Sequence, residues 1–235
     1  MGRDPEARIE LPVAVSAHVR HAVSDADVVI LDLRANRYSI LDGSARCIWE
    51  AAQRLARWDA LVDALVDEFD VEAGRAAADA AAFLDDCRRR GWIGQGAEPR
   101  RPVRSTSTRP RATGAWIWLL RTYVELRARG LWATYRHLAS FGVPERIGDG
   151  GGLLGRALRA FSRAENAFHV RRAPDDCLLR SFALAFFLRS SGLRAVHCIG
   201  VSRYPFAAHA WVEVDGRPIG ESFDPSDHVL LSRLD

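Results

Sequence analysis

The stretch DDCLLRSFALAFFLRSSG, residues 175–192, predicts a helix that begins near a cysteine and ends at a glycine. Asp175 or Asp176 would cap this helix, because a carboxylate accepts hydrogen bonds from the N–H groups of a first turn. Cys177 would then lie where the helix dipole favours the thiolate and where free N–H groups can bind an oxyanion. Since the two aspartates oppose a thiolate, a reactive Cys177 would also need a cationic partner. The alternative is a buried, unreactive cysteine at the start of a core helix.

A second stretch, HAWVEVDGRPIG at residues 209–220, predicts a β-strand that returns through a hairpin at its Asp-Gly pair. Strict alternation places His209, Trp211 and Glu213 on one face of the strand and Ala and Val side chains on the other. On a simple amphipathic strand the valines would face the core and His209 would face solvent. Taken alone, the strand leaves that interpretation open.

The return strand of this hairpin would bring ESFDP, residues 221–225, next to His209. A carboxylate beside the imidazole would fix its tautomer and stabilise the imidazolium. Asp224 and Glu221 both qualify from their spacing along the return strand. With Cys177 as the nucleophile, these groups would form a Cys–His–acid triad.

The N-terminal part of the chain predicts strands followed by helices. The stretch VVILDLRANRYSIL, residues 28–41, is typical of two strands joined by a turn at RAN. A helix capped by Asp42 or Ser44 follows, then one over WDALVDALVDEFDV and a third from about Val71 to Arg90. Strands followed by three helices in so short a span predict a small winged-helix-like α+β module.

The domain boundary is predicted near residue 100. Residues 94–113 are rich in Pro, Ser, Thr, Gly and Arg and too poor in large apolar groups to fold. We therefore expect an N-terminal domain at 1–94, a flexible arginine-rich linker at 95–113 and a C-terminal domain at 114–235. In the last domain helices precede an antiparallel sheet, so its class is also α+β.

Composition excludes several classes of protein. The chain has 235 residues, 48% of them hydrophobic, and a formal charge of +3, which is ordinary for a globular protein and too small to indicate nucleic-acid binding. Because no apolar segment has the roughly 20 residues of a membrane span and the N-terminus lacks a signal-peptide core, we expect a cytoplasmic protein. The four cysteines are far apart, without CxxC spacing, so we expect neither a metal site nor a disulfide framework. His197 and Cys198 form no second catalytic pair, because neighbours on a strand point to opposite faces.

The C-terminal motifs together resemble a known family. CLLRSFALAFFLRSSGLRAVHCIGV, residues 177–201, and HAWVEVDG, residues 209–216, resemble the transglutaminase-like, papain-like cysteine protease of lasso peptide biosynthesis, the B protein. The resemblance covers about residues 115–235. It implies Cys177 as the nucleophile, His209 as the base and Asp224 as the acid, with Glu221 as the alternative acid.

The N-terminal motif resembles a second module. VVILDLRANRYSILDGSARCIWEAA, residues 28–52, is similar to PqqD-like elements, which have a three-stranded sheet and three helices and bind the leader of a ribosomally made peptide. The resemblance implies that a leader adds as a strand near Arg37–Leu41 and packs against the third helix. The residues it implies as leader contacts are Tyr38, Ser39, Ile40, Leu41, Asp79 and Phe83. A DNA-binding winged helix is the alternative, but the acidic DAAAFLDDC of the third helix would repel phosphates.

Both resemblances together imply a fused leader peptidase that needs no cofactor of its own. Its partners would be the precursor peptide and a lasso cyclase, similar to asparagine synthetase, which receives the freed core peptide. A transglutaminase-like amidase or acyltransferase acting on another substrate is one alternative. A catalytically silent adaptor that delivers the precursor to other enzymes is the other.

Overall fold

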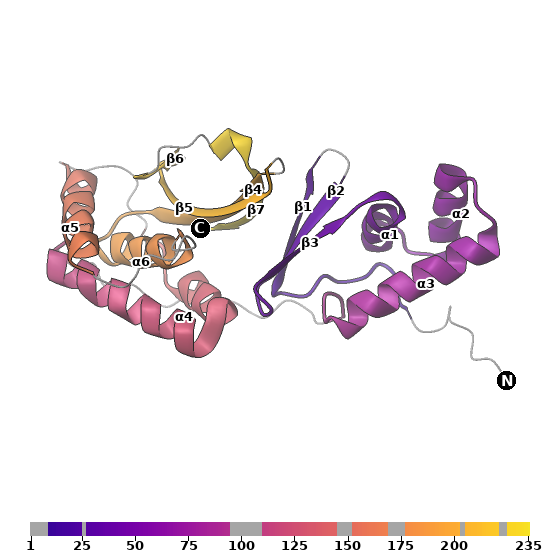
Figure 1. Ribbon diagram of the computed structural model, residues 1–235, viewed down its shortest axis with the longest axis horizontal. Helices are drawn as coiled ribbons and strands as arrows, with labels where there is room; N and C mark the ends of the chain where they lie inside the picture. Colours follow the sequence, from indigo (N-terminus) through magenta and orange to yellow (C-terminus); the bar gives the residue numbers. More distant parts are fainter. Residues whose placement is uncertain are drawn as a thin grey trace. The chain divides into compact units, whose positions relative to one another are not determined.

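The computed structural model describes residues 9–24, 27–94, 110–144, 152–168, 177–202, 205–220 and 225–235. The chain divides into two compact units, Met1–Pro99 and Arg100–Asp235 (Figure 1). Each unit combines helices with an antiparallel sheet, so the predicted α+β class is confirmed.

The first unit packs a three-stranded sheet against three helices. The strands lie in the order β1-β2-β3 and are β1 (Val19–Ser24), β2 (Asp27–Asp32) and β3 (Arg37–Leu41). The helices that follow are α1 (Gly43–Arg54), α2 (Trp58–Phe69) and α3 (Ala73–Arg89). All three helices lie on the same side of the sheet (Figure 1). The core between them is centred on Val28, Ile30, Leu41, Trp49, Leu61 and Leu84.

Asp32 shapes the turn between β2 and β3. Its Oδ1 accepts hydrogen bonds from the backbone N–H groups of Arg34 and Ala35, at 2.9 and 3.0 Å. Asn36 then adopts a left-handed φ of 50°, which asparagine tolerates better than most residues. The indole N–H of Trp92 donates to Oδ2 of the same aspartate at 3.3 Å. The turn predicted at RAN is confirmed, and its geometry sets the register of β3.

The second unit places three helices before a four-stranded sheet. The helices are α4 (Ala112–Ser140), α5 (Leu153–Ala167) and α6 (Cys177–Ser190). The sheet order is β6-β5-β4-β7, with β4 (Ala195–Ser202), β5 (Ala207–Val214), β6 (Arg217–Pro218) and β7 (Val229–Leu234), and a short 3-10 helix, Pro225–Asp227, precedes β7. The hairpin predicted at Asp215 and Gly216 is confirmed, since both residues have left-handed φ values, 53° and 74°.

Helix α6 is the central element of the second unit. It contacts α4, α5, β4 and β5, and eleven of its fourteen residues are buried. Its residue pattern is apolar nearly all round, which is typical of a helix enclosed on every side. The helix therefore has one fixed place in the unit, and so does the residue at its start.

A buried arginine closes the far end of α6. The Arg189 guanidinium is inaccessible to solvent and donates to four backbone oxygens, those of Ala195 (2.8 Å), Leu138 (3.0 Å), Phe141 (3.1 Å) and Leu234 (2.6 Å). Burial lowers the pKa of Arg189 to about 10, so the side chain stays charged at neutral pH. This one residue ties α6 to the end of α4, the start of β4 and the end of β7.

Helix α4 is bent at Gly130, whose φ of 78° and ψ of 177° are not helical. The bend is bridged by Glu125 and His137, whose Oε2 and Nδ1 atoms lie 2.7 Å apart. The helix begins at Ala112, two residues before the predicted start of the C-terminal domain, and residues 95–109 of the predicted linker lie outside the described residues. Across the ranges that the structure describes, no helix combines the length and apolarity that a bilayer crossing requires.

Candidate active site and peptide-binding edge

Cys177 is the first residue of α6, as the sequence predicted, and its side chain is partly buried. A first-turn position gives a thiol the positive end of the helix dipole. The predicted caps Asp175 and Asp176 lie outside the described residues, so the capping of α6 stays a prediction.

Arg180 fixes the first turn of α6 to its surroundings. Its Nε donates to Oε1 of Glu165 on α5 at 2.9 Å, and its Nη2 donates to the backbone oxygen of Gly220 at 3.3 Å. Gly220 is the last described residue before the segment that carries the candidate acids. Arg180 thus lies one turn from Cys177, with its charge paired to Glu165.

Helix α6 runs antiparallel to β4 along one face of the sheet. Near its C-terminal end, Arg189 bonds to Ala195 at the start of β4. Nearer its N-terminal end, Oγ of Ser181 lies 3.0 Å from Nε2 of His197. The Phe182 ring also stacks on that imidazole, with 4.0 Å between ring centroids. His197 therefore points toward α6.

The register of the sheet sets the level of Cys177. The cysteine lies one helical turn, about 6 Å, beyond the contact with His197. A strand covers that distance in about two residues, and the residue of β4 two positions beyond His197 is Ile199. Ile199 is paired with Ala210 of β5, the residue that follows His209. Cys177 and His209 therefore come from two elements in contact, α6 and β5.

His209 points to the face of the sheet opposite α6. His197 contacts the helix, so Gly200, three residues further along β4, points the other way. His209 is the register partner of Gly200 and shares its face. There its imidazole stacks on Trp211, with 6.3 Å between centroids and 9° between planes. For His209 to pair with Cys177, the two side chains would have to meet at the start of β5, beside the first turn of α6. They could not meet through the middle of the sheet.

The face that carries His209 is built to hold Trp211 in one position. A side chain at Gly200 would meet the indole, since its Cβ would lie 2.9 Å from the ring. The indole N–H donates to Oε1 of Glu213 at 3.0 Å, and Arg233 donates to Oε2 at 2.7 Å. Glu213 can be buried because both of its carboxylate oxygens accept hydrogen bonds. The predicted alternation is confirmed, and the ring beneath His209 is fixed.

His228 is a neighbour of His209 that the sequence analysis missed. Its ring centroid lies 6.2 Å from that of His209 and 6.1 Å from that of Trp211. Burial and, secondarily, the charge of His209 lower the pKa of His228. No pattern marks this histidine, because it follows the 3-10 helix at Pro225–Asp227 and belongs to no recognisable motif.

The candidate acids Asp224 and Glu221 lie outside the described residues, so their role stays a prediction. The return strand is described as far as Gly220. Glu213 is paired with Pro218, and the N–H of Ile219 donates to the oxygen of Val212 at 2.8 Å.

The other cysteines are held as thiols by their surroundings. Burial raises the pKa of Cys87 and of Cys198 to about 12, and burial also raises the pKa of Cys47. His197 and Cys198 point to opposite faces, as predicted, and burial lowers the pKa of His197 to about 3. Within the described ranges, no group of three or more His, Cys, Asp or Glu side chains is placed to hold a metal ion.

The predicted leader-binding strand, β3, forms the edge of the first sheet. Among the described strands it pairs with β2 alone, so its second edge offers backbone N–H and C=O groups to a partner. Tyr38 and Ile40 point away from the helices, and Ile40 is 49% exposed. Ser39 and Leu41 point toward the helices. Leu41 is only 7% exposed and belongs to the core, so it could contact a peptide through its backbone alone.

Asp79 and Phe83, the predicted contacts on α3, lie one turn apart on the helix. Asp79 is exposed, and its Oδ2 lies 3.8 Å from Nε of Arg75. Such a surface ion pair is weak and can be exchanged for a ligand. Phe83 is partly buried and packs against the core of the first unit. The two residues therefore differ in what they could offer a peptide.

Comparison with known families identifies both units. Residues 27–93 match the model of coenzyme PQQ synthesis protein D (PqqD), and residues 116–230 match the transglutaminase-like superfamily. The first match runs from β2 to the segment after α3, and the second runs from α4 into β7.

Two individual proteins are also similar. The microcin J25-processing protein McjB of Escherichia coli is 42% identical over 64 residues, which span 27% of this chain and 31% of McjB. The solved structure of TbiB1 in complex with the TbiA(beta) leader peptide is 27% identical, with a TM-score of 0.32, and the match covers 36% of this chain and 98% of that one. The chain therefore combines a PqqD domain in its first unit with a transglutaminase-like domain in its second, and it spans less than a third of McjB.

Proposed function

We propose that this protein is a leader peptidase: the first unit captures the leader of a precursor peptide, and the second unit cleaves the leader from the core peptide. One observation carries the proposal. A PqqD domain shares a chain with a transglutaminase-like domain whose helix α6 begins at Cys177 and packs on the strand that carries His209.

Capture uses the open edge of β3. An extended leader segment adds to β3 as a further strand, and main-chain hydrogen bonds supply most of the affinity. Ile40 and Tyr38 offer side-chain contacts on one face of the added strand, and Ser39 and Asp79 offer polar contacts on the other. Because both units are on one chain, a bound leader raises the effective concentration of its scissile bond at the second unit.

Cleavage proceeds through a thioester. His209 takes the proton from the Cys177 thiol, and the sulfur attacks the carbonyl carbon of the scissile peptide bond. His209 then gives the proton to the leaving amine, which is the N-terminus of the core peptide. A water molecule attacks the thioester, His209 accepts its proton, and the leader carboxylate and the thiol are released. Asp224, or Glu221 in its place, holds the imidazole tautomer and stabilises the imidazolium.

The freed core amine is the group that a macrolactam-forming partner needs. The partner we propose is the lasso cyclase, an enzyme similar to asparagine synthetase, which would join this amine to a carboxylate side chain. The peptidase step must therefore come first, since an acylated amine cannot close the ring.

The test follows the precursor peptide by mass spectrometry after incubation with the full chain, with and without the cyclase. The Cys177→Ala variant is expected to lose cleavage by about a thousandfold and to keep its affinity for the leader. Cys47→Ala is the matched control, because Cys47 is also a partly buried free cysteine on a helix. It should cleave like the wild type.

Other outcomes would refute the peptidase. Cleavage by Cys177→Ala at the wild-type rate would show that another group reacts. Leader binding without cleavage by the wild-type chain, even with the cyclase present, would favour a delivery adaptor. Transfer of the leader acyl group to an added amine in preference to water would favour an acyltransferase.

A further inference from the structure

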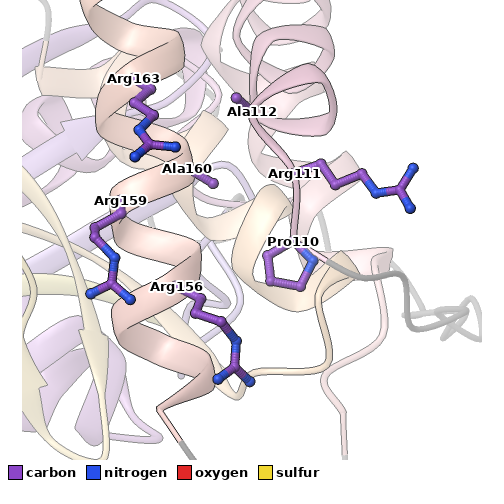
Figure 2. Close-up of a pocket in the computed structure, with 7 residues that line it drawn as sticks. All are labelled: Pro110, Arg111, Ala112, Arg156, Arg159, Ala160 and Arg163. Carbon is purple, nitrogen blue, oxygen red and sulfur yellow. The ribbon is translucent and has the colours of Figure 1, made fainter.

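The second unit has a cavity whose polar lining, among the residues that the structure describes, consists of arginines (Figure 2). It lies where the chain enters α4 beside α5, and its volume is about 340 Å³. Its charged residues are Arg111, Arg156, Arg159 and Arg163, and Pro110 and Ala112 belong to its wall. Its described lining includes neither Cys177 nor His209, and none of the residues proposed for leader binding.

The sequence of α5 places three of these arginines on one side of the helix. Arg156, Arg159 and Arg163 are three and four residues apart, so they are neighbours along the helix surface. In Figure 2 their side chains emerge from the same helix, and Arg111 lies on the segment that enters α4. Like charges at this spacing repel one another and weaken the isolated helix. An anion bound beside Arg159 and Arg163 would relieve this repulsion.

The protein does not supply that anion from the part that the structure describes. No carboxylate there forms an ion pair with Arg111, Arg159 or Arg163. The acidic residue of α5, Glu165, is bonded to Arg180 instead.

Two exposed arginines of the first unit are paired. Arg75 on α3 lies 3.8 Å from Asp79, and Arg90 lies 2.6 Å from Asp86.

The start of α4 adds to the same positive field. Ala112 is the first residue of α4, and the capping residue Arg111 makes no side-chain hydrogen bond to the helix. The first-turn N–H groups of a helix without such a cap remain available to an anion, and they carry the positive end of the helix dipole.

We propose that this cavity binds a phosphate-type polyanion. Each guanidinium group can donate two parallel hydrogen bonds to phosphate oxygens. Several guanidinium groups surround a compact, highly charged anion better than an anion whose charges are spread along a chain. The volume is at the lower end of ligand pockets and the described part of the lining has no aromatic side chain, so the site fits the anionic group better than a large ring system.

The test is a calorimetric titration of the full chain with inorganic pyrophosphate at low ionic strength. Replacing two arginines that lack an ion pair, Arg159→Gln with Arg163→Gln, should weaken binding by at least about tenfold. The matched control, Arg75→Gln with Arg90→Gln, removes the same charge from paired arginines and should change the affinity by less than about twofold. Added salt should weaken the wild type more steeply than the cavity variant.

A second readout separates binding from folding. Without pyrophosphate, the cavity variant should unfold at the same temperature as the wild type or slightly higher, since like-charge repulsion is removed. If the variant unfolds early, Arg159→Lys with Arg163→Lys keeps the charge but loses the planar fork, and it should still weaken binding.

Three results would overturn the proposal. The first is no saturable binding by the wild type, and the second is equal loss in the control variant. The third is tighter binding of triglutamate than of pyrophosphate, which would identify the cavity as a site for an acidic peptide.

Discussion

The two sheets of this protein differ in whether their strands have a free backbone edge. In the first unit, β3 is a short edge strand with exposed residues, and its outer backbone groups face no described strand. In the second unit, β4 lies between β5 and β7, and all of its residues except Ser202 are buried. The first sheet can accept a peptide through its backbone, which tolerates many sequences. The second holds its side chains in fixed positions, as chemistry requires. The proposed binding and the proposed reaction are thus divided between an open edge and a closed sheet.

The largest effect is expected from removing the proposed catalytic base, His209. His209→Ala should lower the cleavage rate by about a thousandfold, because general acid–base catalysis is lost, while leader affinity stays unchanged. His228→Ala is the control, since its ring borders both His209 and Trp211. Single-turnover cleavage measured by mass spectrometry would compare them. If His228→Ala is the more damaging change, the base is assigned to the wrong histidine.

The closed character of the second unit can be tested at Arg189. Arg189→Met leaves four backbone oxygens without their donor in the interior and should lower the free energy of unfolding by about 3 kcal/mol or more. Urea denaturation monitored by tryptophan fluorescence would measure the loss. Arg194→Met changes an exposed arginine five residues away and should have almost no effect. Equal stability of the two variants would contradict the role of Arg189.

The open character of β3 can be tested through the peptide itself. In strand addition only every second amide of the added peptide faces the edge strand. N-methylation of leader amides at one parity should therefore weaken binding by about tenfold, and N-methylation at the other parity should leave it nearly unchanged. Fluorescence anisotropy with labelled leaders would measure both series. The same response at every position would exclude strand addition.

Near neutral pH the smallest expected effect is a pH dependence of stability from His197. Burial holds the folded-state pKa of His197 at about 3, below the ordinary value of 6.5. Between these values the unfolded chain binds a proton that the folded chain excludes. Stability therefore falls as the pH drops below about 6.5, by up to about 1.4 kcal/mol per pH unit. Unfolding free energies should show a weaker acid dependence in His197→Gln.

Comparing the wild type with His197→Gln isolates the contribution of His197 to the pH dependence of stability. Burial also lowers the pKa values of His18 and His21 in the first unit, but both histidines are present in each protein. Parallel pH profiles for the wild type and His197→Gln would mean that the folded protein accepts a proton at this site.

The elements that the sequence predicted are those with a local cause. The turn after β2 follows from Asp32 and Asn36, and the turn after β5 follows from an Asp-Gly pair. The start of α6 at Cys177 follows from an apolar run long enough to be a helix. Each of these features is decided by residues that are close in sequence, so a single chain is enough to find them.

Other features depend on residues far apart in the chain. Strand β7 was not predicted, because a bulge opposite Ile199 and Gly200 breaks its period of two and leaves Leu230 exposed. Its buried Ser232 looks like a surface residue until Tyr135 is found 2.8 Å away. The face of His209 was predicted, but that α6 covers the other face could not be, because only the register of the sheet decides it.

Helix α6 has a consequence for how such a protein can evolve. Residues 181–190 are buried without exception, so almost any substitution there must be matched by changes in several neighbours. The first turn is different, since Cys177, Leu178 and Arg180 are only partly buried. A lineage could change Leu178 and Arg180 while inheriting Cys177 and the rest of the helix unchanged. Directed libraries confined to those two positions should therefore yield mostly folded proteins.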